Sequence, residues 1–209
     1  MVVYVFLADG FEEIEALTPI DLMRRADIHV VTIATGDRLE VKGAHGVTVQ
    51  ADVMLCSGCL PEADMLVCPG GMPGASNLAA SKVLAAMLRE QYEQGRYVAA
   101  ICAAPAVTLA PLGILEGKKA TCYPGFEQQL AEAGATHVAE RVVEDGNIIT
   151  ANGPSSSMPF ALARRSPPRT RSRTVGGAGN TALINGISGS LFKNLFAAGC
   201  VIISQLKIN

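Results

Sequence analysis

The fold is decided by the stretch Tyr97-Val98-Ala99-Ala100-Ile101-Cys102-Ala103-Ala104-Pro105, residues 97–105. Its first five residues form an uninterrupted apolar run, which is typical of a parallel strand buried on both faces. The residues after Cys102 predict a helix over 103–112, because Pro105 is tolerated in a first turn. Cys102 therefore lies on a predicted strand-to-helix turn. A helix N-terminus favours thiolate, so we expect a lowered pKa for this thiol; a buried structural cysteine is the alternative.

Strands and helices alternate outward from this turn. The predicted strands are 2–7, 28–34, 65–68, 97–101 and 148–151, with shorter pieces at 39–41, 47–51, 120–122 and 138–144; the helices are 12–26, 81–94, 103–112 and 126–133. This alternation predicts an α/β fold, with a mostly parallel sheet and helices on both faces. Ligands bind such sheets outside the carboxyl ends of the strands, which singles out the loops 8–15, 69–75, 102–105 and 152–157.

The composition is that of a globular chain with a full core. Of 209 residues, 49% are hydrophobic and 17% are charged, which suits one domain or one domain with an appendage. The N-terminus lacks the basic region of a secretory signal, so we expect a cytoplasmic protein with free thiols. The pair Cys56-Ser57-Gly58-Cys59 has no second pair for zinc. We interpret it as a loop coincidence first and a redox pair second.

Charge divides the chain into two parts. Residues 1–163 carry 10 Lys and Arg against 19 Asp and Glu, whereas residues 164–209 carry 7 Lys and Arg and no acid. Prolines and arginines from Arg164 to Arg173 predict a disordered basic linker, and the apolar stretch 191–206 is short for a membrane span. This abrupt change suggests an altered reading frame or an alternative splice end. A basic arm for nucleic acid or membrane is the less favoured alternative, because no aromatic residues interleave with the arginines.

Three of the loops carry groups that suit one reaction. Most carboxylates in 9–15 should be solvated first-turn side chains, whereas Glu15, one turn into the helix, is placed to face the sheet edge and pass a proton. Gly70 and Gly71, within 69–74, offer unhindered backbone amides for an oxyanion. The amide of Ala103, directly after the cysteine, is placed to be a second donor. Neither G-x-G-x-x-G nor a P-loop is present, so nucleotide binding is not predicted.

Segments 9–15, 69–74, 99–105 and 153–154, in this order, resemble the ThiJ/PfpI superfamily, and within it the DJ-one-like branch. The resemblance covers about residues 1–163. It implies a flavodoxin-like three-layer sandwich, a homodimer, and catalysis without a cofactor. It also implies a glyoxalase that converts methylglyoxal to lactate, or a deglycase acting on early glycation adducts. A non-catalytic oxidative-stress sensor or redox-regulated chaperone is the alternative within the same branch.

The resemblance also assigns site residues. Cys102 matches the family nucleophile, Glu15 the acid that hydrogen-bonds it, and the amides of Gly71 and Ala103 the donors around the sulfur. The substrate-binding positions are Gly70, Pro154, Tyr123, Arg25 and His45, with Arg25 near the dimer interface and Pro154 reaching across it. A solvated loop histidine is an equal alternative for His45. Tyr123 and His45 depart from the branch, which has histidine and arginine there, so a Cys-His protease is not expected.

The implied mechanism needs no metal, and no metal-ligand cluster is visible in the sequence. Thiolate Cys102 attacks the aldehyde to give a hemithioacetal, Glu15 moves a proton between the two carbons, and water releases the hydroxy acid from a thioester. The same thiolate would oxidise readily to sulfinate. Both the enzyme and the sensor need a low thiol pKa, so the sequence does not separate them.

Overall fold

The computed structural model describes residues 1–56 and 58–163. The predicted basic and apolar C-terminal segment, 164–209, and its junction with the N-terminal domain lie outside the described residues. Within the described part, no helix is both long and apolar enough to span a membrane.

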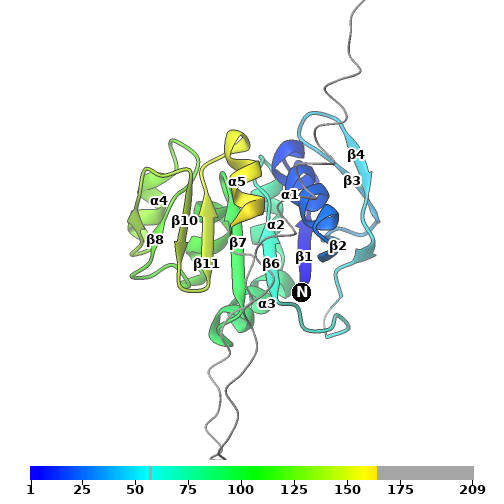
Figure 1. Cartoon of the computed structure of the whole chain (residues 1–209), viewed down its shortest axis with the longest axis horizontal. Coiled ribbons are helices and arrows are strands. Elements are labelled where there is room, and N and C mark those ends of the chain that lie inside the picture. Colours follow the sequence, from blue (N-terminus) through cyan, green and yellow to red (C-terminus); the bar gives the residue numbers. More distant parts are fainter. Residues whose placement is uncertain (57, 164–209) are drawn as a thin grey trace, which may run out of the picture. The chain divides into compact units, whose positions relative to one another are not determined.

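A single sheet of seven strands forms the centre of the described part (Figure 1). Its strand order is β10-β11-β7-β6-β1-β2-β5, and every neighbouring pair is parallel except β10 with β11. The strands are β1 (Val2–Leu7), β2 (His29–Ala34), β5 (Val53–Met54), β6 (Met65–Cys68), β7 (Tyr97–Ile101), β10 (Val142–Asp145) and β11 (Ile148–Ala151). The predicted mostly parallel sheet is confirmed.

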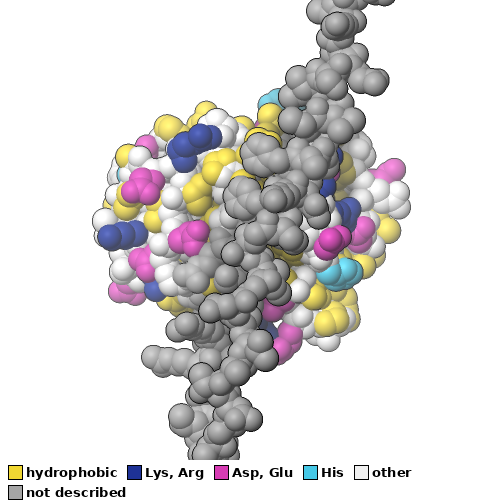
Figure 2. Space-filling view, viewed as in Figure 1, with side chains coloured by type: hydrophobic (Ala, Val, Ile, Leu, Met, Phe, Trp, Pro, Cys, Tyr) yellow, Lys and Arg dark blue, Asp and Glu magenta, His cyan; other side chains and the backbone are white. Residues whose placement is uncertain are grey.

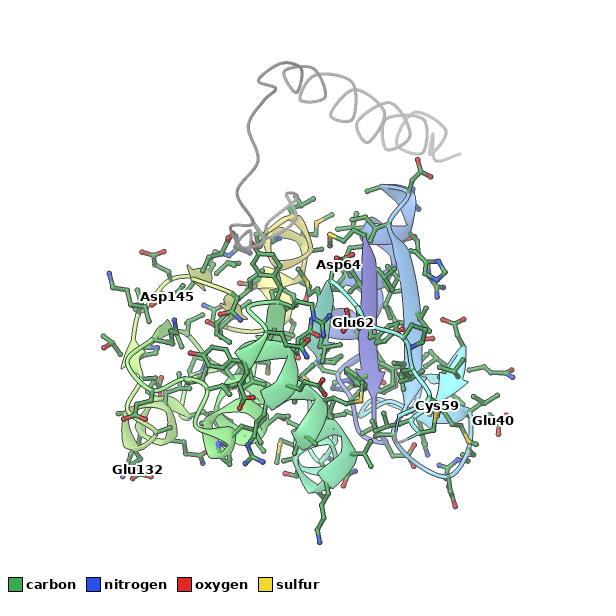
Figure 3. The ribbon with its side chains drawn as sticks, turned by 90° about the horizontal axis from the view of Figure 1, so that it is seen from below. Glu40, Cys59, Glu62, Asp64, Glu132 and Asp145 are labelled. Carbon is green, nitrogen blue, oxygen red and sulfur yellow. A yellow bond between two sulfur atoms is a disulfide. The ribbon has the colours of Figure 1, made fainter. Side chains whose placement is uncertain are left out.

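Helices cover both faces of this sheet. On one face, α1 (Glu13–Arg25) packs against α5 (Ser157–Leu162), and α2 (Gly74–Ala80) and α3 (Lys82–Glu93) lie on the other (Figure 1). Every residue of β6, β7 and β11 is buried, because helices exclude water from both sides of these central strands. The view along the sheet in Figure 3 shows the strands between the two helix layers, which confirms the three-layer sandwich.

Smaller elements complete the domain. A hairpin of β3 (Glu40–Lys42) and β4 (Thr48–Gln50) stands beside the sheet. The short pair β8 (Lys119–Ala120) and β9 (Thr136–His137) flanks α4 (Glu127–Glu132). The predicted strand 138–144 is confirmed only at its end, where β10 covers 142–144; residues 138–141 form no strand.

The predicted helix over 103–112 is not a regular α-helix. It consists of a π-helical turn, η1 (Pro105–Leu109), followed by a 3₁₀ turn, η2 (Ala110–Leu112). Pro105 lies at the start of η1, as its missing N–H requires. The sequence reading also missed α2 and β5. Helix α2 follows the Gly- and Pro-rich loop and has no side-chain N-cap, and β5 has only two residues, too few for a period to show.

The cysteine pair after β5 forms a disulfide between Cys56 and Cys59, whose Cα atoms are 5.8 Å apart, a separation within the range for such bonds. The bond lies at Cys59 in Figure 3. The interpretation as a loop coincidence, and the expectation of free thiols at these two positions, are therefore wrong. Cys68, Cys102 and Cys122 are free and buried.

Candidate active site

Cys102 sits where β7 ends, and its backbone has φ +65°, a conformation that side chains other than glycine rarely adopt. Two hydrogen bonds hold it there. Its N–H donates to the carbonyl of Ala151 at 2.8 Å, and its carbonyl accepts from the N–H of Tyr123 at 2.8 Å. The predicted tight turn after the strand is thus confirmed, and the strained backbone aims the sulfur outside the carboxyl edge of the sheet.

Two glycines let the loop after β6 approach this cysteine closely. A Cβ on Gly70 would lie 2.5 Å from both Cys102 Cβ and Glu15 Oε2, so only glycine fits between these side chains. Gly71 has φ +88°, and a Cβ there would lie 2.3 Å from the backbone nitrogen of Glu12. The backbone amides of Gly71 and Ala103 both hydrogen-bond the sulfur and lower the thiol pKa.

Glu15 lies in the first turn of α1 with its side chain fully buried. Its Oε2 accepts a hydrogen bond from the Gly70 N–H at 3.1 Å. Its Oε1 has no N–H or O–H donor within the described part of the chain. Burial raises the pKa of Glu15 to about 7; the hydrogen bond with Cys102 opposes this shift, and the charge of Glu12 adds to it.

The thiol pKa is the main correction to the sequence prediction. Burial, the charge of Glu15 and the hydrogen bond to Glu15 raise the pKa of Cys102 to about 12, and the two backbone amides only partly oppose them. The helix start after Cys102 therefore does not yield a low thiol pKa. The neighbouring carboxylate disfavours a second negative charge, so near neutral pH the thiol keeps its proton while the Glu15 carboxyl exchanges its own with solvent.

This arrangement supports attack assisted by a base. Ionised Glu15 can accept the thiol proton as the sulfur bonds to an electrophile, and the neutral acid that results can return the proton later. Cys102 is also the most accessible of the free cysteines in the described residues, at 8% exposed against 2% for Cys122 and 0% for Cys68. Reactivity among these thiols is therefore directed to Cys102.

A depression of about 610 Å³ opens over the sulfur. Besides Cys102 it is lined by Glu12, Glu13, Ile14, His45, Val47, Tyr123 and Pro154. The structure thus brings together three of the five predicted substrate-binding residues, Tyr123, Pro154 and His45. Gly70 does not line the depression but lies against the side chains of Cys102 and Glu15. Arg25 does not join them: at the end of α1 it binds Asp21 through Nε at 2.8 Å and does not line the depression.

Sequence reasoning missed the roles of Glu12 and Glu13, which it expected to be solvated. Both are buried. Glu12 caps α1 by accepting from the Glu15 N–H at 2.7 Å. Glu13 accepts from the His45 N–H at 2.7 Å and contacts His45 Nδ1 at 2.7 Å. In the structure Gly43 has no side chain to obstruct the Glu13 carboxylate, because a Cβ there would lie 2.4 Å from Glu13 Oε1. A glycine in a turn is not by itself a sequence signal for this contact.

The fold also gathers metal-ligating side chains that show no ligand spacing in the sequence. Donor atoms of Glu12, Glu13 and His45 lie within 4.8 Å of one another. The fold creates this grouping, which is not visible in the sequence. Hydrogen bonds within α1 and to the hairpin turn account for the positions of these carboxylates, so the cluster alone supports no metal site.

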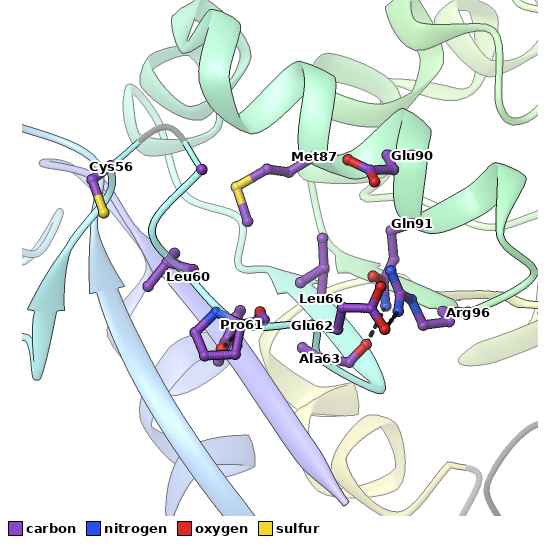
Figure 4. Close-up of a pocket in the computed structure, with 12 residues that line it drawn as sticks. Cys56, Leu60, Pro61, Glu62, Ala63, Leu66, Met87, Glu90, Gln91 and Arg96 are labelled. Carbon is purple, nitrogen blue, oxygen red and sulfur yellow. Dashed lines mark hydrogen bonds and ion pairs between the residues drawn. The ribbon is translucent and has the colours of Figure 1, made fainter.

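A second pocket of about 150 Å³ lies between the loop before β6 and helix α3 (Figure 4). The ion pair of Glu62 with Arg96 borders it, and Gln91 donates to the carbonyl of Ala63 at 3.0 Å. None of the predicted site residues lines it. Where the face in Figure 2 is not covered by grey residues, acidic and basic side chains are interspersed. The depression over Cys102 is the candidate site because it holds the predicted nucleophile.

Comparisons with known proteins agree with this site and fold. The model of the DJ-1/PfpI family matches residues 1–164. DJ-1 homolog B of Arabidopsis thaliana is 43% identical over 161 residues, which are 77% of this chain and 36% of that protein. DJ-1 homolog A of the same plant is 40% identical, and the match covers 77% of this chain and 41% of that protein. The chain therefore spans well under half of these two relatives.

Other relatives match over most of their length. A protein named deglycase from Pyrococcus horikoshii is 31% identical, and the match covers 74% of this chain and 92% of that protein. The structure of oxidized Toxoplasma gondii DJ-1 has a TM-score of 0.73 at 41% identity and covers 77% of this chain and 86% of that one. Family match, identities and structural likeness together show that the chain belongs to the DJ-1/PfpI family.

Proposed function

We propose that the protein is a cofactor-independent glyoxalase or deglycase, which uses Cys102 as nucleophile on methylglyoxal or on early glycation adducts. The observation that carries this proposal is the buried pair of Glu15 and Cys102 beneath an open depression. A carboxyl group with a pKa of about 7 is suited to both accept and donate a proton at neutral pH. The deglycase name of the Pyrococcus relative supports the same chemistry.

The reaction begins when the sulfur bonds to the aldehyde carbon of methylglyoxal and the thiol proton passes to Glu15. The amides of Gly71 and Ala103 stabilise the hemithioacetal oxygen. Glu15 returns the thiol proton to the hemithioacetal oxygen. As a carboxylate again, it takes the proton from the carbon bonded to sulfur and delivers it to the neighbouring carbonyl carbon, while the hydroxyl proton passes from the first oxygen to the second. A lactoyl thioester is then left on Cys102. Water attacks this thioester, the carbon–sulfur bond breaks, and lactate leaves. The aldehyde carbon is oxidised to the acid level while the neighbouring ketone carbon is reduced to an alcohol, so no external oxidant or reductant is consumed.

We also propose that the protein acts as a homodimer in the cytoplasm. Large apolar side chains stand exposed on the α1 and α5 face, with Ile14, Leu162 and Met158 at 53%, 41% and 62% exposed. A second copy covering this face would bury them. It would also border the depression, which Ile14 lines. Contact of the basic tail with nucleic acid or a membrane remains the less favoured alternative.

A second candidate function is an oxidative-stress sensor or redox-regulated chaperone that uses the same cysteine. It is favoured by the oxidized state named for the Toxoplasma relative and by the greater accessibility of Cys102 over the other free thiols. The high thiol pKa argues against spontaneous oxidation, since thiolate is the species that peroxide attacks. We therefore rank the sensor second.

The test is lactate formation from methylglyoxal without glutathione. We expect turnover by the wild type, none by Cys102→Ser, and full turnover by Cys68→Ser, a matched control at a buried cysteine outside the site. A folded wild type that forms no lactate, yet oxidises selectively at Cys102 under mild peroxide, would reject the enzyme in favour of the sensor. Sedimentation of the full chain tests the dimer, and a monomer at micromolar concentration would reject it.

A further inference from the structure

We propose that Glu13 and His45 form a second catalytic dyad, in which the imidazole is the general base for the water that releases the acyl group from Cys102. This inference rests on the proposed function, because it concerns the step that completes the same reaction. It assigns the hydrolysis to side chains that act neither as nucleophile nor as the acid of the Cys102 pair.

The position of His45 supports this role. It stands in the turn between β3 and β4 and lines the same depression as Cys102. Its side chain is 73% exposed, so water reaches the ring freely. Glu15, by contrast, is fully buried beneath the sulfur. An acyl group on the sulfur would separate Glu15 from solvent water, and a base on the open side is needed to activate that water.

Glu13 holds the ring in one orientation. Its Oε2 lies 2.7 Å from His45 Nδ1, while its Oε1 accepts from the backbone N–H of the same histidine at 2.7 Å. The N–H of Val47 donates to the same Oε1 at 3.4 Å. These contacts of Glu13 with the ring and the backbone of His45 make Nδ1 the bonded nitrogen and leave Nε2 as the nitrogen that can take a proton. A carboxylate that orients an imidazole beside a nucleophile is the arrangement that general-base catalysis requires.

The turn itself is fastened to the start of α1. The Ala44 N–H donates to the carbonyl of Phe11 at 2.8 Å, and the Gly10 N–H donates to the carbonyl of Lys42 at 2.7 Å. The absence of a side chain on Gly43 makes room for the Glu13 carboxylate. The histidine is therefore positioned by the same loop after β1 that leads to Glu15, and not by a free surface loop.

The step balances without any further reactant. Nε2 of neutral His45 takes a proton from water as the water oxygen bonds to the thioester carbon. The tetrahedral intermediate then collapses, the carbon–sulfur bond breaks with its electron pair on sulfur, and the imidazolium proton passes to the sulfur. The products are the free carboxylic acid and the Cys102 thiol.

The charges around His45 determine how this step depends on pH. The titratable groups that face it are Glu13 and Glu12 from α1, with Cys102 and Tyr123 on the other walls of the depression. The hydrogen bond and charge of Glu13 raise the pKa of His45, and Glu12 adds to the shift. In the acyl-enzyme Cys102 does not titrate. Deacylation should therefore rise with pH as His45 loses its proton, with a midpoint above the ordinary value of 6.5.

The experiment separates deacylation from the steps before it. Cys102 is acylated with p-nitrophenyl acetate in one arm and through methylglyoxal in the other. Mass spectrometry follows loss of the acyl group over pH 5–9, which covers about two units either side of an unshifted histidine. In both arms we expect the deacylation rate of His45→Gln to fall about 100-fold, which is the lower end of what a positioned general base contributes. The rise of this rate with pH, which depends on His45, should also be lost. Glu13→Gln should shift the midpoint downward, and the control His137→Gln should behave as wild type.

Wild-type deacylation rates and pH profiles in His45→Gln would overturn the dyad. Absence of acyl-Cys102 with both reagents would overturn it as well, because the base would have no thioester to act on. If methylglyoxal leaves no acyl group but the acetyl group is lost in a His45-dependent manner, the proposed substrate fails and the dyad stands.

Discussion

The first turn of α1 buries a carboxyl group on each of two sides, and the pKa values of these two groups are shifted in opposite directions. On the sheet side, Glu15 receives one backbone hydrogen bond, from Gly70, and burial raises its pKa to about 7. On the hairpin side, burial again acts to raise the pKa of Glu13. There, however, hydrogen bonds from His45 and Val47 outweigh it, and the pKa of Glu13 is lowered.

This difference shows that burial alone does not set the charge of a carboxyl group. Two glutamates only two residues apart are kept in different states by the number of N–H donors that the neighbouring loop supplies. The loop after β6 gives Glu15 one backbone donor, and the turn after β7 places the Cys102 thiol beside it, which suits a group that must exchange protons. The hairpin turn gives Glu13 donors on both oxygens, which suits a fixed negative charge that orients an imidazole.

Replacing the carboxyl on the sheet side should have the largest effect. In Glu15→Gln the amide cannot accept the thiol proton, so thioester formation from methylglyoxal should fall by about 10²- to 10⁴-fold. Rapid-quench mass spectrometry of Cys102 measures this step. Asp21→Asn, at an exposed carboxylate of the same helix, is the control. The rate of thioester formation in Asp21→Asn should match wild type. A rate in Glu15→Gln within about threefold of that control would contradict the role of Glu15.

Stability should depend on pH with opposite signs on the two sides. The folded state keeps a proton on Glu15 that the unfolded chain loses from about pH 4.5, so the free energy of unfolding falls as pH rises from there to about 7. The loss is on the order of 3 kcal/mol, and Glu15→Gln should be spared it. Ionised Glu13 stabilises the fold above its ordinary pKa, and that contribution disappears as pH falls through its lowered value.

Urea denaturation at a series of pH values measures both effects. The free energy of unfolding of wild type should fall relative to that of Glu15→Gln from pH 4.5 to 7, and the difference should then level off. The difference between wild type and Glu13→Gln should shrink as the solution becomes more acidic. Parallel curves for the two variants would mean that the two carboxyls are not distinguished by the fold.

Two glycines with nearly the same φ allow a comparison of how closely the sheet side and the hairpin side of α1 are packed. Gly71, beside the Cys102 site, has φ +88°, and Gly46, in the hairpin turn, has φ +89°. A Cβ meets backbone atoms at 2.3–2.7 Å at Gly71 but nothing within 4 Å at Gly46. Gly71→Ala should therefore cost about 1–3 kcal/mol more in the free energy of unfolding than Gly46→Ala, since both share the φ strain. Equal losses in thermal or urea unfolding would show that the sheet side is not closely packed.

The smallest effect is expected from the ion pair at the rim. The raised pKa of His45 means that its interaction with Glu13 stabilises the fold fully below pH 6.5 and that this contribution is lost as pH rises through the raised value. The melting temperature of His45→Gln should thus lie slightly below that of wild type at pH 5.5 and match it at pH 9. A constant difference across this range would mean that charge plays no part in the effect.

The central strands and the position of the nucleophile could be predicted from sequence. Strand 97–101 and strand 148–151 coincide with β7 and β11, because a strand buried on both faces leaves a continuous apolar run. The turn at Cys102 followed from the same run, since a helix must start where a parallel strand ends. The predictions failed for properties that depend on contacts between residues far apart in the sequence. The thiol pKa depends on a carboxyl group 87 positions earlier in the chain. The helical position of Glu15 predicted that it faces the sheet edge, but no local pattern gives the effect of this group on the thiol pKa.

The same limit explains the misjudged carboxylates. Glu12 and Glu13 resemble solvated first-turn residues, and the sequence spacing carries no sign that the turn 43–46 folds over Glu13. The resemblance assigns Arg25 to a substrate-binding position near a dimer interface, and this stays a prediction; within the described chain Arg25 pairs with Asp21 on its own helix. The segment 164–209 lies outside the described residues, so its predicted character stays a prediction.

The most direct test of this account is the carbon-13 NMR titration of side-chain carboxyls in glutamate-labelled protein, with Glu13→Gln and Glu15→Gln used to assign the two signals. The account predicts that the Glu15 signal titrates near pH 7 and that the Glu13 signal titrates below its ordinary value of 4.5. Titration of both near 4.5 would contradict it, because Glu15 would then be permanently ionised at neutral pH and unable to carry the proton that the proposed reaction requires.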